Sequence, residues 1–166
     1  GKSAESSATE YIKVLRATFA ALRKSNSKEA ALYLTDLAVT NRDDAWKITQ
    51  TVLIGAESAY RCDQLKGKPA DAPTLQKVLL ACAEKPDAAA KTTLAQAVAV
   101  AHGMKLTKDL GNLPGNICTP SYLADQAKAI AKTFKLEVEV LEEKDMQKLG
   151  MNSLLSVTRG SREPAK

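Results

Sequence analysis

Residues 109–120 read Asp-Leu-Gly-Asn-Leu-Pro-Gly-Asn-Ile-Cys-Thr-Pro. Two glycines, two prolines and two asparagines in this stretch supply positive-φ positions and fixed φ values, so we expect no helix or strand to pass through it intact. Thr119 followed by Pro120 then predicts a new helix, because Thr accepts hydrogen bonds from a first turn and Pro suits the first helical position. The stretch is therefore predicted to be a hinge between two parts of the chain.

The hinge also resembles the segment through which leucyl (cytosol) aminopeptidases enter their catalytic domain. The resemblance is carried by Asp109–Pro114, Asn116–Pro120 and Tyr122-Leu123-Ala124. Gly115 stands where the family usually has a second Pro, and we expect it to loosen the loop. Two more stretches resemble the family in the expected order, namely Gly55-Ala56 through Tyr60-Arg61 and Leu149–Val157 with Gly160-Ser161.

The resemblance implies what the parent protein does. Family members remove N-terminal residues, preferably leucine-like, from peptides, using two divalent ions (zinc, manganese or magnesium) that activate water and polarise the carbonyl, and they assemble as homohexamers. Their active-site groups come from Gly-Lys-Gly-x-Thr-Phe-Asp-x-Gly-Gly and Asn-Thr-Asp-Ala-Glu-Gly-Arg motifs, and this sequence contains neither. We therefore assign no catalytic and no metal-ligating residue and expect the chain to bind none of these ions. It is expected to be an inactive internal fragment, cut at both ends.

The composition is that of a globular protein rather than a disordered one. Aromatic residues make up only 4% of the chain, so the core must depend on Leu, Val, Ile and Ala. No apolar run approaches the roughly 18–20 residues that span a bilayer, and no signal segment opens the chain, which predicts a soluble, cytoplasmic protein without membrane contact. Cys62, Cys82 and Cys118 are widely spaced and lack a C-x-x-C pattern, so buried or half-buried free thiols are expected.

Apolar spacing predicts an α/β arrangement before the hinge. Residues 9–24 and about 43–61 have helical periodicity, and Asn41 is expected to cap the second helix, with Asp43 and Asp44 in its first turn. Dense apolar runs predict buried strands over 30–39 and 75–83, although Ala and Leu leave the first ambiguous. The Ala-rich residues 87–108 predict a long helix that leads into the hinge. The small polar residues 1–8 are expected to fray.

A second α/β pattern begins at the hinge. A helix is predicted from Pro120 to about Lys132, a strand over the alternating residues 136–141, a short helix over 145–149 ended by Gly150, and a strand over 153–158. Strand, helix and strand together predict a right-handed crossover in a larger parallel sheet. The predicted fold class is thus α/β, with part of an N-terminal α/β domain over 1–86, a connecting helix over 87–108, and the incomplete start of a catalytic α/β domain over 109–166.

Other groups that could carry chemistry have structural interpretations. His102 has no Glu or His four residues away, so it is expected to pack or to form hydrogen bonds rather than to bind metal. Glu142, Glu143 and Asp145 cluster at a helix start, where they offset the helix dipole. The glycines of the hinge lack the Lys-Ser/Thr of a phosphate-binding loop, and no serine lies in a G-x-S-x-G context. A Cys118–His102 pair stays open, although nothing in the sequence positions a third group to orient it.

A different function class is suggested by the basic residues. The formal charge is +5, and the densest basic stretch comprises Arg16, Arg23, Lys24 and Lys28. Such residues usually form a solvated helix face. However, some bacterial members of the resembled family bind DNA through their N-terminal domains, so the chain could serve as an assembly or DNA-binding module. The stretch has no interleaved aromatic residues and no helix-turn-helix pattern, so the sequence does not establish this role.

Overall fold

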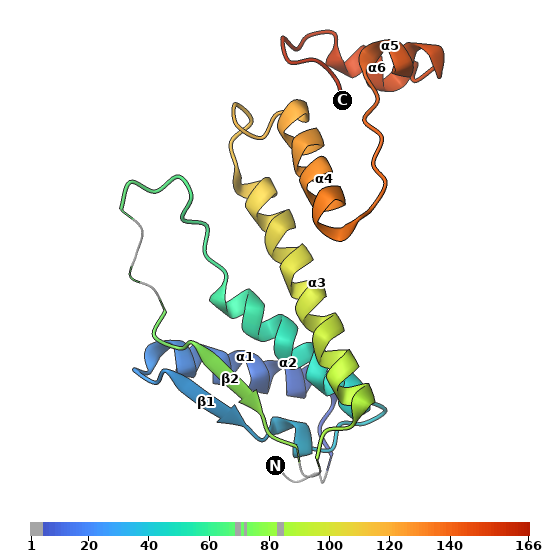
Figure 1. Cartoon of the computed structure of the whole chain (residues 1–166). Coiled ribbons are helices and arrows are strands. Elements are labelled where there is room, and N and C mark those ends of the chain that lie inside the picture. Colours follow the sequence, from blue (N-terminus) through green and yellow to red (C-terminus); the bar gives the residue numbers. More distant parts are fainter. Residues whose placement is uncertain (1–4, 69–70, 72, 83–84) are drawn as a thin grey trace. The chain divides into compact units, whose positions relative to one another are not determined.

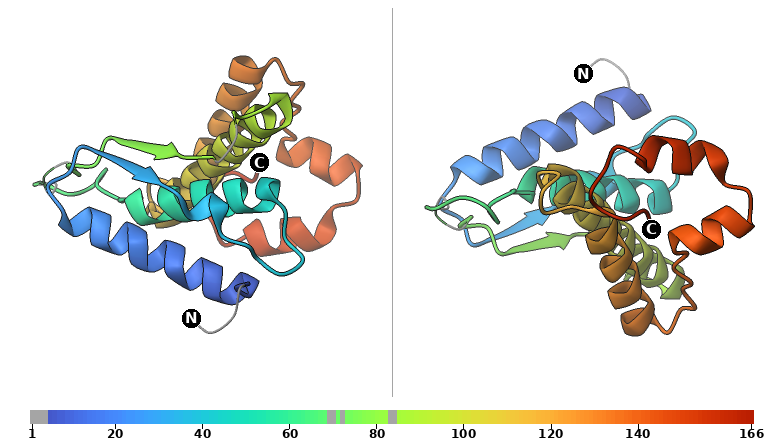
Figure 2. Two further views of the ribbon diagram at one scale, coloured as in Figure 1. Left: turned by 90° about the horizontal axis from the view of Figure 1, so that it is seen from below. Right: turned by 90° about the horizontal axis from the view of Figure 1, so that it is seen from above.

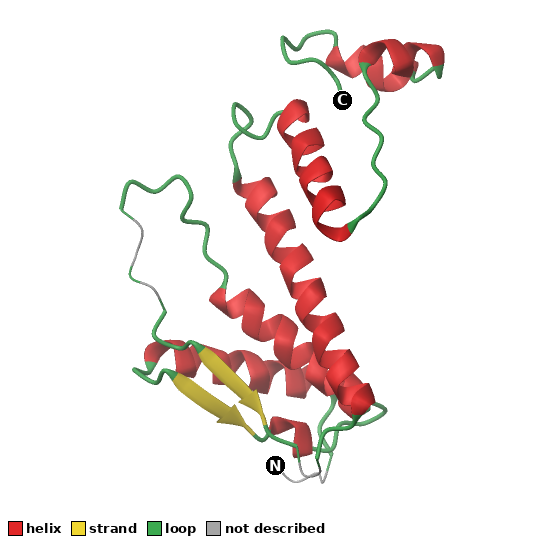
Figure 3. Ribbon diagram, viewed as in Figure 1, coloured by secondary structure: helices red, strands yellow, loops and turns green. Residues whose placement is uncertain are grey.

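The computed structural model describes residues 5–68, 71, 73–82 and 85–166 (Figure 1). The chain divides into two compact units, residues 1–107 and 108–166. Helices dominate both units, and the strands form one small parallel sheet (Figure 3). The α/β class expected from the sequence is thereby confirmed. The elements in chain order are α1 (Ala8–Lys24), β1 (Glu29–Leu32), the 3-10 helix η1 (Leu34–Asp36), α2 (Asp44–Ala59), β2 (Lys77–Leu80), α3 (Ala88–Asn112), α4 (Pro120–Phe134), α5 (Glu143–Lys148) and α6 (Asn152–Thr158).

Helix α1 forms where its apolar spacing predicts it. Its start is fixed by a capping box, in which the Ser7 side chain accepts from the Glu10 backbone N–H and the Glu10 carboxylate accepts from the Ser7 backbone N–H. The backbone of Ser6 also bonds to Ala38 and Thr40. The expectation that residues 1–8 fray is therefore wrong for Ser6 and Ser7, because both have specific partners. Residues 1–4 lie outside the described residues.

Helix α2 is confirmed, but its cap is not the residue expected. The Asp43 side chain accepts from the Trp46 N–H at 2.8 Å and is the N-cap. Asn41 instead takes a left-handed conformation with φ 56°, which Asn tolerates better than most residues. The expectation of an Asn41 cap was wrong because a carboxylate placed directly before the helix reaches its free N–H groups, whereas Asn41 turns the chain.

The sheet is shorter than the two apolar runs suggested. Strands β1 and β2 pair in parallel, from Glu29 opposite Lys77 to Leu32 opposite Leu80, and lie side by side in both views of Figure 2. Leu34–Asp36 form η1 rather than continuing the strand, so the predicted strand over 30–39 is only partly correct. The predicted end of the second strand at Ala83 lies outside the described residues.

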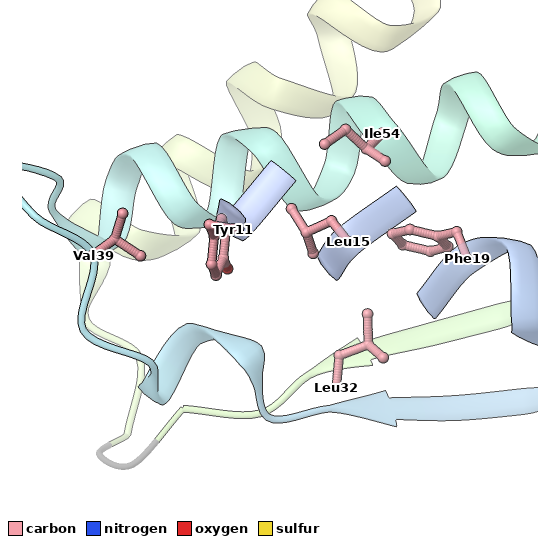
Figure 4. Packing of buried hydrophobic residues seen from close by; sticks show 6 residues of the cluster. All are labelled: Tyr11, Leu15, Phe19, Leu32, Val39 and Ile54. Atoms are coloured by element: carbon pink, nitrogen blue, oxygen red, sulfur yellow. The ribbon is translucent and has the colours of Figure 1, made fainter. Parts of the chain in front are cut away.

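The core of the first unit lies between α1, α2 and one face of the sheet. Figure 4 shows its six buried residues, which are Tyr11, Leu15, Phe19, Leu32, Val39 and Ile54. The three from α1 recur every four residues and therefore share one helix face. Gly55 allows α2 to approach this face closely, because a Cβ at that position would lie 2.8 Å from the Phe19 ring.

Helix α3 extends further than expected. It passes through Gly111 and ends at Asn112 rather than at Lys108. It still ends inside residues 109–120, so the expectation that no helix passes through this stretch intact is confirmed. Neither Gly111 nor Gly115 has a positive φ; among the described glycines only Gly150 does, at 71°. The chain does bend at residues 113–119, where the Pro114 carbonyl accepts from the N–H groups of Ile117 and Cys118 at 2.9 Å. The bend thus depends on Pro114 rather than on left-handed glycines.

The predicted start of α4 is confirmed. The Thr119 side chain accepts from the Tyr122 N–H at 3.2 Å, and Pro120 occupies the first turn. The short helix α5 also forms close to the range expected. Gly150 follows it in the left-handed conformation that suits the end of a helix.

Both strands predicted in the second unit are wrong. Residues 136–141 are irregular, because a strand needs a neighbour for its N–H and C=O groups and no described residue pairs with them. Residues 152–158 form α6, in which the Leu155 N–H donates to the Met151 carbonyl. A short apolar run does not distinguish strand from helix, and helical bonds need no partner strand. The predicted crossover is accordingly not formed among the described residues.

Candidate functional site

The acidic side chains of the second unit serve local structure. The Glu142 N–H donates to Asp145 Oδ2 at 3.3 Å, within the capping box of α5. Glu143 Oε1 accepts from the Ala165 N–H at 3.1 Å, and the Glu142 carboxylate pairs with Lys166. All three acids lie at the start of α5, where negative charge is favourable, and their contacts are with nearby backbone groups and Lys166.

Nowhere in residues 5–68, 71, 73–82 and 85–166 do three or more His, Cys, Asp or Glu side chains form a group that could hold a metal ion. A two-metal peptidase centre requires several converging carboxylates around its ions. The described residues therefore do not fit such a centre, and no catalytic step is derived from them.

The other candidate nucleophiles and bases are His102 and the three cysteines. His102 is exposed on α3, which contradicts the packing alternative, and the hydrogen-bonding alternative stays a prediction. All three cysteines are free thiols. Cys62 and Cys118 are half-buried, as expected, whereas Cys82 is exposed, so the expected burial is wrong for Cys82. His102 belongs to the first unit and Cys118 to the second, and a pairing between them stays a hypothesis.

The first unit contains an apolar groove of about 870 Å³. Its walls come from the end of α1, from α2 and Arg61 after it, from the segment leading into β2, from β2 itself and from the first half of α3. Apolar side chains that line it include Val52, Val78, Leu80, Leu94 and Val98. Leu94 and Val98 are 40% and 38% exposed, so this face of α3 is only partly covered. The groove can accommodate apolar groups, but no cluster of reactive side chains lines it.

A salt-bridge cluster stabilises the loop that follows α2. Asp63 accepts from the Arg61 guanidinium at 2.7 Å and from Lys66 Nζ at 2.9 Å. The hydrogen bond from Lys66, and then the positive charge of Arg61, hold the pKa of the Asp63 carboxyl below its ordinary value. Arg61 also donates to the Asp71 carbonyl. The contacts of Arg61 therefore tie together two points of the loop between α2 and β2.

A second, polar pocket of about 700 Å³ contains the buried Lys47. Lys47 Nζ donates to the carbonyls of Thr35 and Leu37, at the end of η1, and pairs with Asp44 at 2.7 Å. Buried charges require such partners. Lys47 therefore fastens η1 to α2. Nearby, burial raises the pKa of Tyr11 above its ordinary value.

The four basic residues considered for DNA binding are all exposed, and three of them lie close together in the chain. Arg23 and Lys24 occupy the last turn of α1, where positive charge offsets the helix dipole, and Lys28 directly precedes β1. Arg16 lies earlier on α1 and has Glu57 of α2 at 4.0 Å. Arg23 and Lys24 therefore have a local role at the end of α1, and Arg16 has one beside Glu57.

Comparison with known proteins decides the family. Residues 1–69 match the N-terminal domain of the cytosol aminopeptidase family, and residues 105–166 match the catalytic domain of the same family. The chain belongs to the cytosol aminopeptidase family. Probable cytosol aminopeptidases of Nitrosomonas europaea and Nitrosospira multiformis are 54% and 48% identical to the whole chain. The chain covers 34% and 33% of those relatives, about a third of their length.

Solved structures agree with this assignment. The bottromycin maturation enzyme BotP is 26% identical to this chain, with a TM-score of 0.74 over 93% of this chain and 32% of BotP. A variant of tomato leucine aminopeptidase gives a TM-score of 0.78 at 24% identity, over 99% of this chain and 33% of that one. The second likeness concerns the fold alone.

Two features of the first unit were not predicted from the sequence. The apolar groove was not anticipated, although Gly55 in a helix indicated a close helix approach on one of its walls. Lys47 was not singled out, because α2 contains several other polar residues and nothing in its local sequence marks this lysine as buried. Neither feature could be located from the sequence, because both depend on segments far apart in the chain. None of the described helices combines the length and apolarity needed to cross a bilayer.

Proposed function

We propose that this chain is part of a cytoplasmic, metal-dependent leucyl aminopeptidase that removes N-terminal residues, preferably leucine-like, from peptides. One observation carries the proposal: the N-terminal and catalytic domains of one aminopeptidase family are matched in that order on a single chain. The reaction would use two divalent ions, zinc, manganese or magnesium, which supply a metal-bound water nucleophile and polarise the peptide carbonyl.

The residues of this chain would provide the scaffold of the enzyme and not its reacting groups. In this proposal residues 1–86 belong to the N-terminal domain, 87–108 connect the domains, and 109–166 begin the catalytic domain. The position of α3 supports the connecting role, because this helix crosses the boundary between the two compact units. The absence of a metal-binding group among the described residues supports catalysis by residues elsewhere in the protein.

The activity is tested on the complete protein that contains this chain. We expect it to hydrolyse leucine p-nitroanilide, to lose that activity on dialysis against a chelator, and to regain it with manganese or zinc. Glycine and aspartate p-nitroanilides, compared at equal concentration, should react more slowly. Full activity after chelation would contradict metal dependence, and equal rates for all three substrates would contradict the leucine preference.

The same protein is proposed to assemble as a homohexamer. Several large apolar side chains are exposed in this chain, as expected for surfaces that meet other parts of an assembly. In the second unit they include Leu123 at 46%, Phe134 at 68% and Leu149 at 65%. Light scattering on the complete protein should give six times the mass of one chain. A monomer at micromolar concentration would contradict the proposal.

DNA binding by the first unit is a second, weaker proposal. It is supported by the exposure of Arg16, Arg23, Lys24 and Lys28, although the neighbouring Glu57 offsets the charge of Arg16. Binding of duplex DNA should weaken steeply from about 50 to 200 mM salt, because phosphate contacts release counterions. Replacing Arg23, Lys24 and Lys28 by Gln should weaken it further, whereas replacing Lys148 of the second unit should not. No binding at 50 mM salt would exclude the proposal.

A further inference from the structure

Helix α3 contains an interior glycine for which packing gives no reason. A Cβ added at Gly103 would meet no atom within 4 Å. Gly55 in α2 is the opposite case, since a Cβ there would lie 2.8 Å from the Phe19 ring. Glycine inside a helix lowers its stability relative to alanine, because the backbone loses more conformational freedom on ordering. Gly103 therefore weakens α3 without a gain in packing.

A second feature acts on the same turn of the helix. The Thr107 hydroxyl donates to the Gly103 carbonyl at 3.0 Å. Such a bond to the carbonyl four residues earlier competes with the backbone hydrogen bond of the helix and often bends it. The weakest residue of the turn and the side chain that competes for its carbonyl are thus paired.

The weakened turn also lies where α3 leaves its packing. The buried residues of α3 are Ala97 and Ala101, which are 2% and 8% exposed. The next four residues, from His102 to Lys105, are all exposed, and the first compact unit ends at Thr107. Fully buried side chains therefore hold α3 at Ala97 and Ala101, whereas from His102 to Thr107 no side chain is fully buried and only Leu106 is half-buried.

We propose that α3 is a hinged connector that bends reversibly between Gly103 and Thr107. Each unit keeps its own fold while the direction of the helix changes at this turn. The hinge is a property of this chain alone, so it can be correct even if the peptidase proposal is wrong, and the reverse also holds.

The test measures distances inside α3, which separates this hinge from the bend at residues 113–119. Spin labels are attached at Gln96→Cys and Gly111→Cys, both exposed positions, in a chain whose three natural cysteines are replaced by serine. An unbent helix places these positions about 22 Å apart along its axis at 1.5 Å per residue. We expect a broad distance distribution that extends below this value. Gly103→Ala should narrow it, and Thr107→Ala should narrow it less.

Two comparisons keep the test decisive. Thr92 makes the same kind of bond to the Ala88 carbonyl in the first turn of α3, so Thr92→Ala is the matched control and should leave the distribution unchanged. Hydrogen exchange of the unlabelled chain should show amides 103–107 slowed about fivefold by Gly103→Ala, the factor that corresponds to ~1 kcal/mol. A single narrow distance in the parent chain, or a broad one that Gly103→Ala does not change, would overturn the proposal.

Discussion

The two units of the molecule differ in how their helices are held. In the first unit, Tyr11 and Leu15 of α1 are 1% and 0% exposed and pack in a cluster with side chains from α2 and β1. In the second, the buried hydrophobic side chains among the described residues are Ala131, Met146 and Ala165. Helical periodicity predicted the structure correctly where the apolar face of a helix packs against other elements, as in α1. Without such a partner, local hydrogen bonding decided it, as in α6.

The largest expected effect contrasts a core position with an exposed one. Leu15→Ala should lower the free energy of unfolding by about 2–5 kcal/mol, because it removes buried methyl groups and leaves a cavity. Val157→Ala in the second unit should cost less than about 0.5 kcal/mol, since Val157 is 80% exposed. Urea unfolding followed by the fluorescence of Trp46, the single tryptophan, measures the first unit, and far-UV circular dichroism measures both. Equal effects of the two substitutions would contradict the contrast between the units.

The two helix glycines should respond to alanine with opposite sign. Gly55→Ala should destabilise the first unit by about 1–3 kcal/mol, because its Cβ would press on the Phe19 ring. Gly103→Ala should instead stabilise α3 by about 0.5–1 kcal/mol, since its Cβ meets no atom. Thermal unfolding of both variants measures the difference. In the background of Phe19→Leu, the cost of Gly55→Ala should shrink, and an unchanged cost would show that the contact is not its cause.

The Asp43 cap of α2 predicts a smaller difference in the free energy of unfolding. Asp43→Ala should cost about 1 kcal/mol, because the Trp46 N–H loses its acceptor. Asn41→Gly should lower the free energy of unfolding by no more than a few tenths of a kcal/mol, since glycine adopts φ 56° without strain. Urea unfolding of the two variants ranks them. A larger loss for Asn41→Gly would restore Asn41 as the cap.

The smallest expected effect concerns pH. Hydrogen bonds from the Ser7 backbone and then its side chain lower the pKa of Glu10. A carboxyl with a lowered folded-state pKa contributes stability above its unfolded pKa and loses it as the pH falls through the folded value. The melting temperature of the chain should therefore fall less between pH 5 and pH 3 in Glu10→Gln than in the parent. An equal fall in Glu10→Gln and in the parent would contradict a stabilising role of the ionised Glu10 carboxylate.

How far the sequence predicted the fold depended on whether a signal was local. The Thr119-Pro120 start of α4 and the apolar spacing of α1 are local, and both were confirmed. The Ser7 and Glu10 pair, three residues apart, also has the sequence pattern of a capping box, although the small polar residues around Ser7 led to the expectation of a frayed N-terminus. Residues 136–141 alternate as a strand does, yet alternation does not supply the neighbour that a strand requires.

The candidate site was predictable only through the family. The resemblance of residues 109–124 led to the aminopeptidases, which the family matches confirm. The apolar groove and Lys47 could not be predicted, because each depends on segments that meet only after folding. Their residues give no local pattern beyond the single Gly55.

The central claim is that residues 1–166 supply a scaffold while the metal-binding and reacting groups lie elsewhere in the protein. The most direct test is leucine p-nitroanilide hydrolysis by the purified chain with manganese, zinc or magnesium. Trp46 fluorescence and circular dichroism would establish that the chain is folded. We predict no hydrolysis above the rate of the metal alone. Hydrolysis that co-purifies with the chain and disappears with a chelator would contradict the account.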